Sequence, residues 1–410
     1  MNKSVNTKLS VFIFLMVACI SCVEKYWPDL KNGHESSLVV DGRITNEPGP
    51  YTITLSTTSS LQDFDSISDF NPVSDATVTI TDDEGNSETL LEVEAGVYKT
   101  SETGIQGIIG RKYKLSIIAS EKHYESEFEE LRSPVEIESA HFEIETRLTE
   151  DRLDEADTEE KGYQFYVTTK TAAEDKNYYY WELEETYEYH AYYRATKIFN
   201  GKFTKVTYEE ANSLFYCWNT NTIKKVFTQS TEFLSSPKIY NFPLSFASFK
   251  DYKLREKYCL LIKQFTISKN AYVFYKGIED QNSNTDDLYT SQPYRILGNL
   301  VNTQNPEEAV LGYFLVAGVS KSPHIFTPKV FIDSDYDYSI DHCFIPIIDD
   351  VEAYLSWVHP DNYPLYVAYG WVRIPPLYGQ YVFIETFVSK DCIDCRTRGG
   401  TNQKPDFWDD

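Results

Sequence analysis

The sequence is poor in basic residues. Only 38 of its 410 residues are Lys or Arg, against 63 Asp and Glu, so the formal net charge is −25 at pH 7. A surface of this charge repels phosphate backbones and disfavours contact with other polyanions. We therefore exclude nucleic acid as a partner, and adsorption of the protein body to anionic lipid is disfavoured for the same reason.

Residue patterns of the common catalytic sites are also missing. The seven histidines are scattered, and no two of them stand four residues apart beside a Glu. The chain has no Gly-x-Ser-x-Gly elbow, no phosphate-binding loop and no dinucleotide fingerprint. Asp341, His342 and Cys343 are adjacent, but neighbours in a strand point to opposite faces, so adjacency is weak support for a site. We predict a protein that is not an enzyme and uses no cofactor or metal.

The chain has one long apolar run, at its start, and no second run long enough to span a membrane. Residues 1–8 carry two lysines and no acid, and residues 9–21 are almost wholly apolar. A basic lead, a short apolar core and a small residue at the cut are typical of a secretory signal peptide, whereas a membrane span needs about 20 apolar residues. We predict a lipoprotein signal peptide over residues 1–21.

Cysteine directly after the predicted cleavage site is typical of a bacterial lipoprotein. The thiol of Cys22 would be acylated, and two or three buried acyl chains hold a protein at a bilayer far better than one. Cys22 is therefore the predicted lipidation site. Two alternatives stay open, because Cys19 is preceded by a similar small-residue box and because an ordinary secreted protein could carry a free N-terminal cysteine.

Cysteines are few in the rest of the chain. Five remain, an odd number that leaves at least one thiol without a partner: Cys217, Cys259, Cys343, Cys392 and Cys395. Cys392 and Cys395 have the spacing of a redox site or a zinc half-site, but a second pair of this spacing and a strand-then-helix context are missing. We predict a structural disulfide that involves one or both of them, with pairing left open.

Alternating apolar and polar residues predict a mostly β fold. A tether over residues 22–36 precedes a β-sandwich, Ig-like or transthyretin-like, over residues 37–133. Within it, Ala76, Val78 and Ile80 alternate with threonines, as in a strand with one buried face. The acidic segment 82–86 is predicted to be a solvated hairpin tip, in preference to a calcium loop.

A larger β-rich domain with a few short helices is predicted over residues 134–390, and a C-terminal Cys-x-x-Cys and aromatic tail over residues 391–410. The acidic stretch 149–161 is predicted to be an exposed loop. In the following aromatic stretch, one face is predicted to cover a core and the other to carry acids: Glu182, Glu184, Glu185 and Glu188.

Three short helices are predicted in this second domain. Thr207 and Glu210 form a capping box at the start of the first. Ser268 can cap the second, which ends near Asn282, and the third covers residues 349–358.

Several motifs in fixed order resemble one known family. At the C-terminus, Cys392-Ile393-Asp394-Cys395 is followed by Gly399-Gly400 and by Pro405-Asp406-Phe407-Trp408. Further motifs occur in the expected order over nearly the whole mature chain: Pro28-Asp29-Leu30, Trp181-Glu182, Cys217-Trp218, Asn305-Pro306-Glu307 and Leu311-Gly312-Tyr313-Phe314. The chain resembles a Bacteroidota family of outer-membrane lipoproteins that is described only as a domain of unknown function.

The resemblance implies a location and a partner. Members are typically encoded beside TonB-dependent receptors, which implies an accessory, ligand-capturing lipoprotein of a transporter complex in the outer membrane. It favours Cys22 over Cys19, and it leaves the face of the membrane open, because Glu24 is acidic while Lys25 follows it. Two other functions stay open: a secreted hydrolase acting on glycan or peptide, and a structural surface or adhesion lipoprotein.

Overall fold

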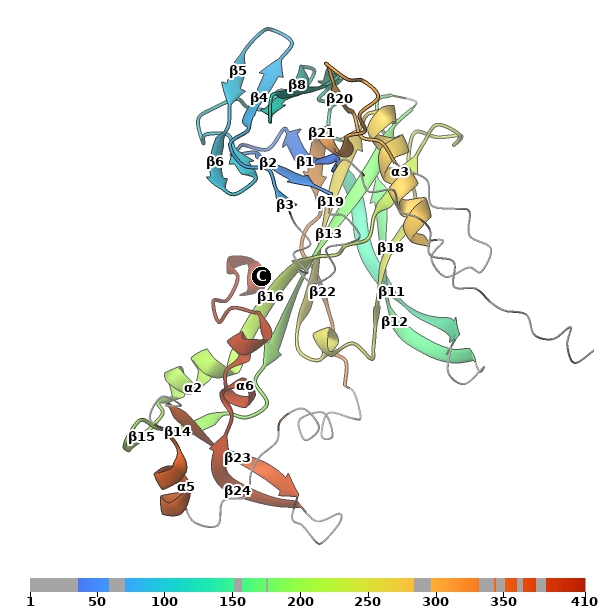
Figure 1. Cartoon of the computed structure of the whole chain (residues 1–410). Helices are drawn as coiled ribbons and strands as arrows, with labels where there is room; N and C mark the ends of the chain where they lie inside the picture. The colour runs from blue at the N-terminus through green and yellow to red at the C-terminus, as the bar shows by residue number, and fades with distance from the viewer. Residues whose placement is uncertain are drawn as a thin grey trace, which may run out of the picture.

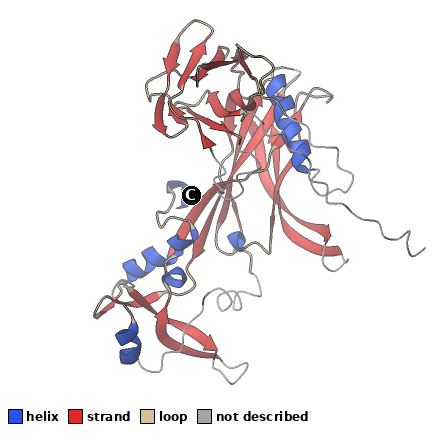
Figure 2. Cartoon of the chain, in the orientation of Figure 1, coloured by secondary structure: helices blue, strands red, loops and turns tan. Residues whose placement is uncertain are grey.

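The computed structural model describes residues 36–58, 71–150, 157–174, 176–283, 296–331, 343, 351–359, 364–373 and 381–409. About half of these residues are in β-strands and far fewer are in helices (Figures 1 and 2). The predicted mostly β fold class is thereby confirmed. The predicted signal peptide, Cys19, Cys22 and nearly all of the tether lie outside the described residues, as do Asp341 and His342. None of the helices in the described ranges combines the length and the apolar character that a membrane crossing requires.

A β-sandwich forms at the N-terminal end of the described chain. One sheet contains β1 (Leu38–Thr45), β2 (Thr52–Thr57), β3 (Asn71–Pro72), β6 (Leu91–Glu94) and β7 (Val97–Lys99). The other contains β4 (Thr77–Asp82), β5 (Ser87–Thr89), β8 (Lys112–Ala119), β9 (Lys122–Ser126), β10 (Glu129–Glu130) and β20 (Leu300–Asn302). Alternate side chains such as Val78, Ile80 and Leu115 are buried between the sheets, as the alternation in the sequence predicts.

The predicted hairpin tip connects β4 to β5 and is closed by its own first residue. One carboxylate oxygen of Asp82 accepts hydrogen bonds from the backbone amides of Glu84 and Asn86, at 3.1 and 2.8 Å. The other accepts from the Arg111 guanidinium at 2.6 Å. This carboxylate therefore stabilises the turn through bonds within the protein.

A parallel pairing joins the sandwich to a strand from much later in the chain. β21 (Leu311–Lys321) lies beside β1, in register from Val39 with Leu311 to Thr45 with Ala317. The large sheet runs in the order β16-β13-β19-β21-β1-β2-β7-β6, where β16 is Tyr216–Thr222, β13 is Tyr178–His190 and β19 is Tyr258–Ile267. The sheet thus continues across residue 134, the boundary between domains that the sequence predicts.

Gly312 is the residue that allows this close pairing. Its φ of +82° lies in the left-handed region, which glycine adopts without a steric penalty. A Cβ atom at this position would lie 1.9 Å from the backbone oxygen of Val40. Any larger residue at position 312 would push β21 away from β1.

A second sandwich packs β13, β16 and β19 against a separate three-stranded sheet. That sheet contains β11 (Ile137–Glu150), β12 (Asp157–Thr169) and β18 (Phe242–Ser248). Short strands β17 (Phe227–Ser230) and β22 (Ile325–Thr327) extend the large sheet beside β13 and β19. Aromatic side chains fill the core between the layers, among them Phe165, Tyr179 and Trp181. The predicted aromatic core face of β13 is therefore present.

The acidic stretch 149–161 differs from the predicted loop. β11 and β12 pair in antiparallel register as far as Glu150 with Asp157, so both ends of the stretch belong to strands. Within this hairpin Glu160 pairs with Arg147, which offsets part of the repulsion between like charges. In Figure 1 this hairpin diverges from β13 and β16 toward the bottom of the view.

A small C-terminal lobe lies at the opposite end of the molecule from the first sandwich (Figure 1). Its sheet contains β14 (Ala195–Phe199), β15 (Phe203–Lys205), β23 (Leu365–Arg373) and β24 (Tyr381–Val388). The tail follows as α6 (Lys390–Ile393), η3 (Cys395–Arg398) and η4 (Asp406–Asp409). Tyr189 donates a hydrogen bond to the Cys395 carbonyl at 2.9 Å, which ties the tail to β13.

The described helices begin close to where the sequence predicts them. α2 (Tyr208–Phe215) has the predicted capping box between Thr207 and Glu210. In α3 (Lys269–Ser283) the Ser268 hydroxyl accepts from the Ala271 amide, and the third helix is α5 (Val351–Trp357). A short 3-10 helix, η1 (Tyr252–Leu254), precedes β19.

Candidate functional site

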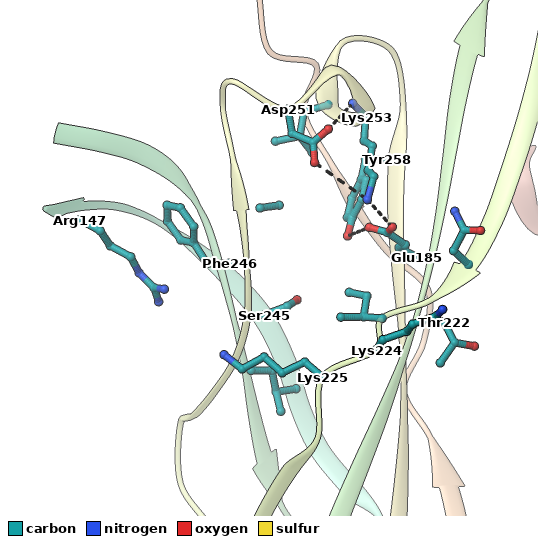
Figure 3. A pocket seen from close by; sticks show the side chains of 15 residues that line it. Arg147, Glu185, Thr222, Lys224, Lys225, Ser245, Phe246, Asp251, Lys253 and Tyr258 are labelled. Carbon is teal, nitrogen blue, oxygen red and sulfur yellow. Dashed lines mark hydrogen bonds and ion pairs between the residues drawn. The ribbon is translucent and has the colours of Figure 1, made fainter. Parts of the chain in front are cut away.

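The cavity between the two layers of the second sandwich is the best candidate site. It has a volume of about 820 Å³, within the range of small-molecule sites. Its lining comes from β11, β13, β18, η1, β19 and the segment that follows β16. We call it the basic cleft, for the lysine and arginine side chains that line it: Arg147, Lys224, Lys225 and Lys253 (Figure 3).

A buried carboxylate with its partners forms the inner wall of the basic cleft. Glu185 is only 7% exposed, and its two oxygens accept hydrogen bonds from Lys253 Nζ at 2.6 Å and from Tyr258 Oη at 3.1 Å. Asp251 places a second carboxylate 4.0 Å from the same ammonium. Both oxygens of Glu185 are satisfied, so its burial is compensated within the protein.

This network keeps its members in fixed protonation states. Burial lowers the pKa of Lys253, but the hydrogen bond and the negative charge of Glu185 outweigh it, and the net pKa is raised. Burial raises the pKa of Tyr258 well above its ordinary value, and the charge of Glu185 adds to the shift. Lys253 therefore stays an ammonium and Tyr258 a neutral phenol near pH 7, which suits a rigid wall better than a general base.

The rim of the basic cleft carries positive charge. Lys224 and Lys225 are exposed in the segment after β16, and no carboxylate in the described ranges lies within ion-pair distance of either. The Arg147 guanidinium lies 4.2 Å from the centre of the Phe246 ring and donates to the Gln164 side-chain oxygen. In a chain of net charge −25, such a rim attracts anions locally.

Ser245 adds an unused hydrogen-bonding group inside the basic cleft. Its Oγ is buried and has no hydrogen-bond partner among the described residues. In Figure 3, Ser245 lies between Arg147 on one side of the cavity and the network of Glu185 and Lys253 on the other. A buried hydroxyl without a partner is costly, so this group is well placed to bond a ligand that enters.

Apolar side chains complete the lining. Leu244, Ile223 and Leu254 line the cavity beside the polar groups, and the Phe246 ring adds an aromatic wall. The arrangement can hold an organic anion, with its charged group at the rim and its hydrocarbon part against these side chains. Within the described residues, no group of three or more His, Cys, Asp or Glu side chains is arranged to hold a metal ion.

None of the cysteines that the structure describes lines this cleft. The two cysteines of the Cys-x-x-Cys motif form disulfides with distant partners and not with each other: Cys217 with Cys395, and Cys343 with Cys392. Cys259 is free and buried, as the odd count requires. Cys343 thus sits in a disulfide, and Cys22 lies outside the described residues.

The cleft could not be predicted from the sequence, because its residues come from six separate parts of the chain. One feature of the sequence does indicate a residue of the cleft. Glu185 has the same parity along β13 as Trp181, Leu183 and Tyr187, so it belongs on the core face, and its predicted place on the acidic face was wrong. An acid in register with a run of buried aromatics indicates a buried, compensated carboxylate.

The model of a domain of unknown function, DUF4249, matches residues 23–322. No curated protein matches the chain significantly. Since the matched residues cover most of the chain, including all parts of the basic cleft, the protein belongs to the DUF4249 family.

Proposed function

We propose that this member of the DUF4249 family is a lipid-anchored lipoprotein of the Bacteroidota outer membrane, where it captures a ligand as a non-enzymatic subunit of a TonB-dependent transporter complex. The observation that carries the proposal is the chemistry of the basic cleft. Its inner acid is neutralised by Lys253, while its rim offers Lys224 and Lys225 without acidic partners. A site of this kind can bind and hold a ligand, but it offers no group poised to transfer a proton.

The ligand class follows from the same chemistry. Rim cations and the Ser245 hydroxyl suit a carboxylate, sulfate or phosphate group, and Phe246 with Leu244 suits an apolar or aromatic part. Arg147 is held over Phe246, so it presents a fixed guanidinium face at the mouth of the cleft. We infer that the captured molecule is an organic anion.

The anchor rests on the sequence pattern around Cys22. A basic lead and an apolar core followed by Ser21-Cys22 support cleavage before Cys22 and acylation of its thiol. Such an anchor would hold the protein at the bilayer even though its acidic body is not attracted to the lipid surface. The proposed role beside a transporter comes from the resemblance of the chain to lipoproteins encoded with TonB-dependent receptors.

Purification from detergent-extracted outer membranes tests the proposed partner. We expect a β-barrel receptor to be recovered with a C-terminally tagged chain, and mass spectrometry to find acyl chains on Cys22. The control is Cys22→Ala, which should leave the protein soluble and without the receptor, while Cys19→Ala should behave like the unchanged chain. Recovery of acylated protein without any β-barrel would contradict the transporter role.

Calorimetry with small probes tests the proposed ligand class separately. The purified full chain should bind 4-phenylbutyrate at least about tenfold more tightly than 4-phenylbutanol, because only the anion can use the rim cations. Equal affinity for the two probes would contradict capture of an anion in the basic cleft.

Protease treatment of whole cells shows which face of the outer membrane the protein occupies.

A further inference from the structure

A second cavity lies where α3 packs beside β10 and β21. It has a volume of about 620 Å³ and is lined by residues of α3, the ends of β9 and β20, the segment 296–299 and β21. None of its described lining residues is Lys, Arg or His. We call it the acidic pocket, after the three glutamates that line it: Glu125, which pairs with Lys114, and Glu127 and Glu129.

Glu129 is the residue that makes the acidic pocket unusual. It is 7% exposed, and one of its oxygens accepts a hydrogen bond from Tyr313 Oη. The other oxygen, Oε2, is buried and has no hydrogen-bond partner among the described residues. A buried carboxylate whose donors are all neutral is left with most of its charge uncompensated.

The environment opposes the charge of Glu129 in two further ways. Burial raises its pKa to about 6, and the charge of Glu127 adds to the shift. The hydrogen bond from Tyr313 and the weaker polar contacts of the Ser268 and Asn299 side chains act in the opposite direction without cancelling it. No described lysine or arginine forms an ion pair with either carboxylate. Near pH 7 Glu127 and Glu129 therefore hold negative charge that no ion pair in the described chain neutralises.

Apolar side chains surround this charge on the outside. Three of them are large, exposed and on the lining: Val273 at 61%, Leu297 at 58% and Val301 at 52% exposure. Deeper in the pocket, the rings of Phe274 and Tyr313 lie 4.9 Å apart. Exposed apolar residues that gather around a concave site are typical of a ligand-binding surface.

These contacts indicate the class of ligand. A divalent metal ion needs six or more oxygen ligands, and the described residues hold no group of three or more acidic, histidine or cysteine side chains that could bind one. An organic ammonium fits better, because its charge can pair with Glu129 and bond Oε2 while the aromatic faces attract the cation. Its hydrocarbon part would cover Val273, Leu297 and Val301.

We propose that the acidic pocket is a second binding site, which takes an organic amine with its ammonium group on Glu129 and its apolar part against the rim residues Val273, Leu297 and Val301. The site is separate from the basic cleft and does not depend on the function proposed for the chain. It would let one molecule hold two ligands of opposite charge.

The test measures binding of matched probes to the purified full chain by calorimetry. We expect 4-phenylbutylamine to bind at least about tenfold more tightly than 4-phenylbutanol, since a hydrogen bond to a charged group is worth that much. Equal binding of the amine and the alcohol would overturn the proposal.

Two variants separate this site from general attraction of cations to an acidic protein. Glu129→Gln should abolish the preference for the amine, whereas Glu130→Gln, the next residue of β10, which is exposed and does not line the pocket, should keep it. A preference that survives Glu129→Gln would show adsorption to the surface and would overturn the proposal.

Val273→Lys keeps the proposal testable if Glu129→Gln fails to fold. Residue 273 is exposed on α3, so a lysine there can place its own ammonium in the pocket and compete with the probe. We expect loss of amine binding with an unchanged affinity for 4-phenylbutyrate in the basic cleft. Unchanged amine binding in this variant would overturn the site.

Discussion

Each of the two cavities is lined by a buried glutamate, and the two carboxylates differ in how far their oxygens are hydrogen-bonded within the protein. In the basic cleft, Glu185 has an ammonium and a phenol as donors, so both of its oxygens are bonded inside the protein. In the acidic pocket, Glu129 has one phenol, from Tyr313, and a second oxygen without a partner. Equal burial thus gives a structural carboxylate in one place and a carboxylate with unused binding capacity in the other.

The two cavities also differ in where their unpaired charges lie. The basic cleft has its unpaired charges outside, on Lys224 and Lys225, where water solvates them. The acidic pocket has its unpaired charge inside and apolar residues outside. The first arrangement favours rapid attraction of an anion, and the second favours tight burial of a cation that carries hydrocarbon.

The largest effect should come from removing the ammonium of the basic cleft. Lys253→Met leaves Glu185 buried without its ion-pair partner, which costs about 3 kcal/mol of unfolding free energy. Urea denaturation at pH 7 measures the loss. Adding Glu185→Gln to the same chain should recover most of it, because the buried charge is gone. A cost below about 1 kcal/mol for Lys253→Met would mean that Glu185 is not compensated as described.

The next effect concerns the acid that lacks such a partner. The pKa of Glu129 is raised from 4.5 to about 6 in the folded protein, so its contribution to stability is complete below pH 4.5 and is lost as the pH rises through 6. We expect the unchanged chain to lose about 2 kcal/mol relative to Glu129→Gln between pH 4.5 and 7. Glu130→Gln is the matched control and should follow the unchanged chain. Parallel curves for the chain and Glu129→Gln would refute the shift.

A smaller effect is expected from reversing the rim charges of the basic cleft. Lys224→Glu with Lys225→Glu should weaken 4-phenylbutyrate binding about tenfold and leave 4-phenylbutylamine binding unchanged, because only the first probe uses this rim. The control is Lys202→Glu with Lys205→Glu, the same charge change in the C-terminal lobe, where the expected effect is small. Equal losses of 4-phenylbutyrate affinity in the two double variants would mean that the net charge of the protein, and not the rim of the cleft, causes the effect.

The smallest effect is expected for Ser245→Ala. The Ser245 hydroxyl is buried and has no partner within the described chain, so its removal breaks no hydrogen bond and should not lower the unfolding free energy. Anion binding should still weaken by a factor of a few, since one donor to the ligand is lost. If stability falls by more than about 1 kcal/mol with unchanged binding, the hydroxyl serves the fold and not the ligand.

Local features of the fold could be predicted from the sequence. Strands such as β4 can be predicted from the spacing of Val78 and Ile80, because side chains of a strand alternate between faces and one face is buried. The start of α2 is read from Thr207 and Glu210, because a capping box involves residues only three apart. Both depend on neighbours in the chain.

Contacts between distant segments could not be predicted in this way. Nothing near Cys392 identifies Cys343 as its partner, and nothing in β1 identifies β21, since both pairings depend on the finished fold. The cavities are made by the same kind of contact. Glu129 and Tyr313, for example, meet only because α3, β10 and β21 are packed together.

The parallel pairing of β1 with β21 also sets the order in which the protein can mature. Val39 pairs with Leu311, about 270 residues further along the chain. The first strand of the described chain is therefore synthesised long before the strand with which it pairs. Contacts of such long range slow folding, because a large loop must close before they form. The N-terminal sandwich, although synthesised first, therefore completes its larger sheet only after most of the polypeptide has been made.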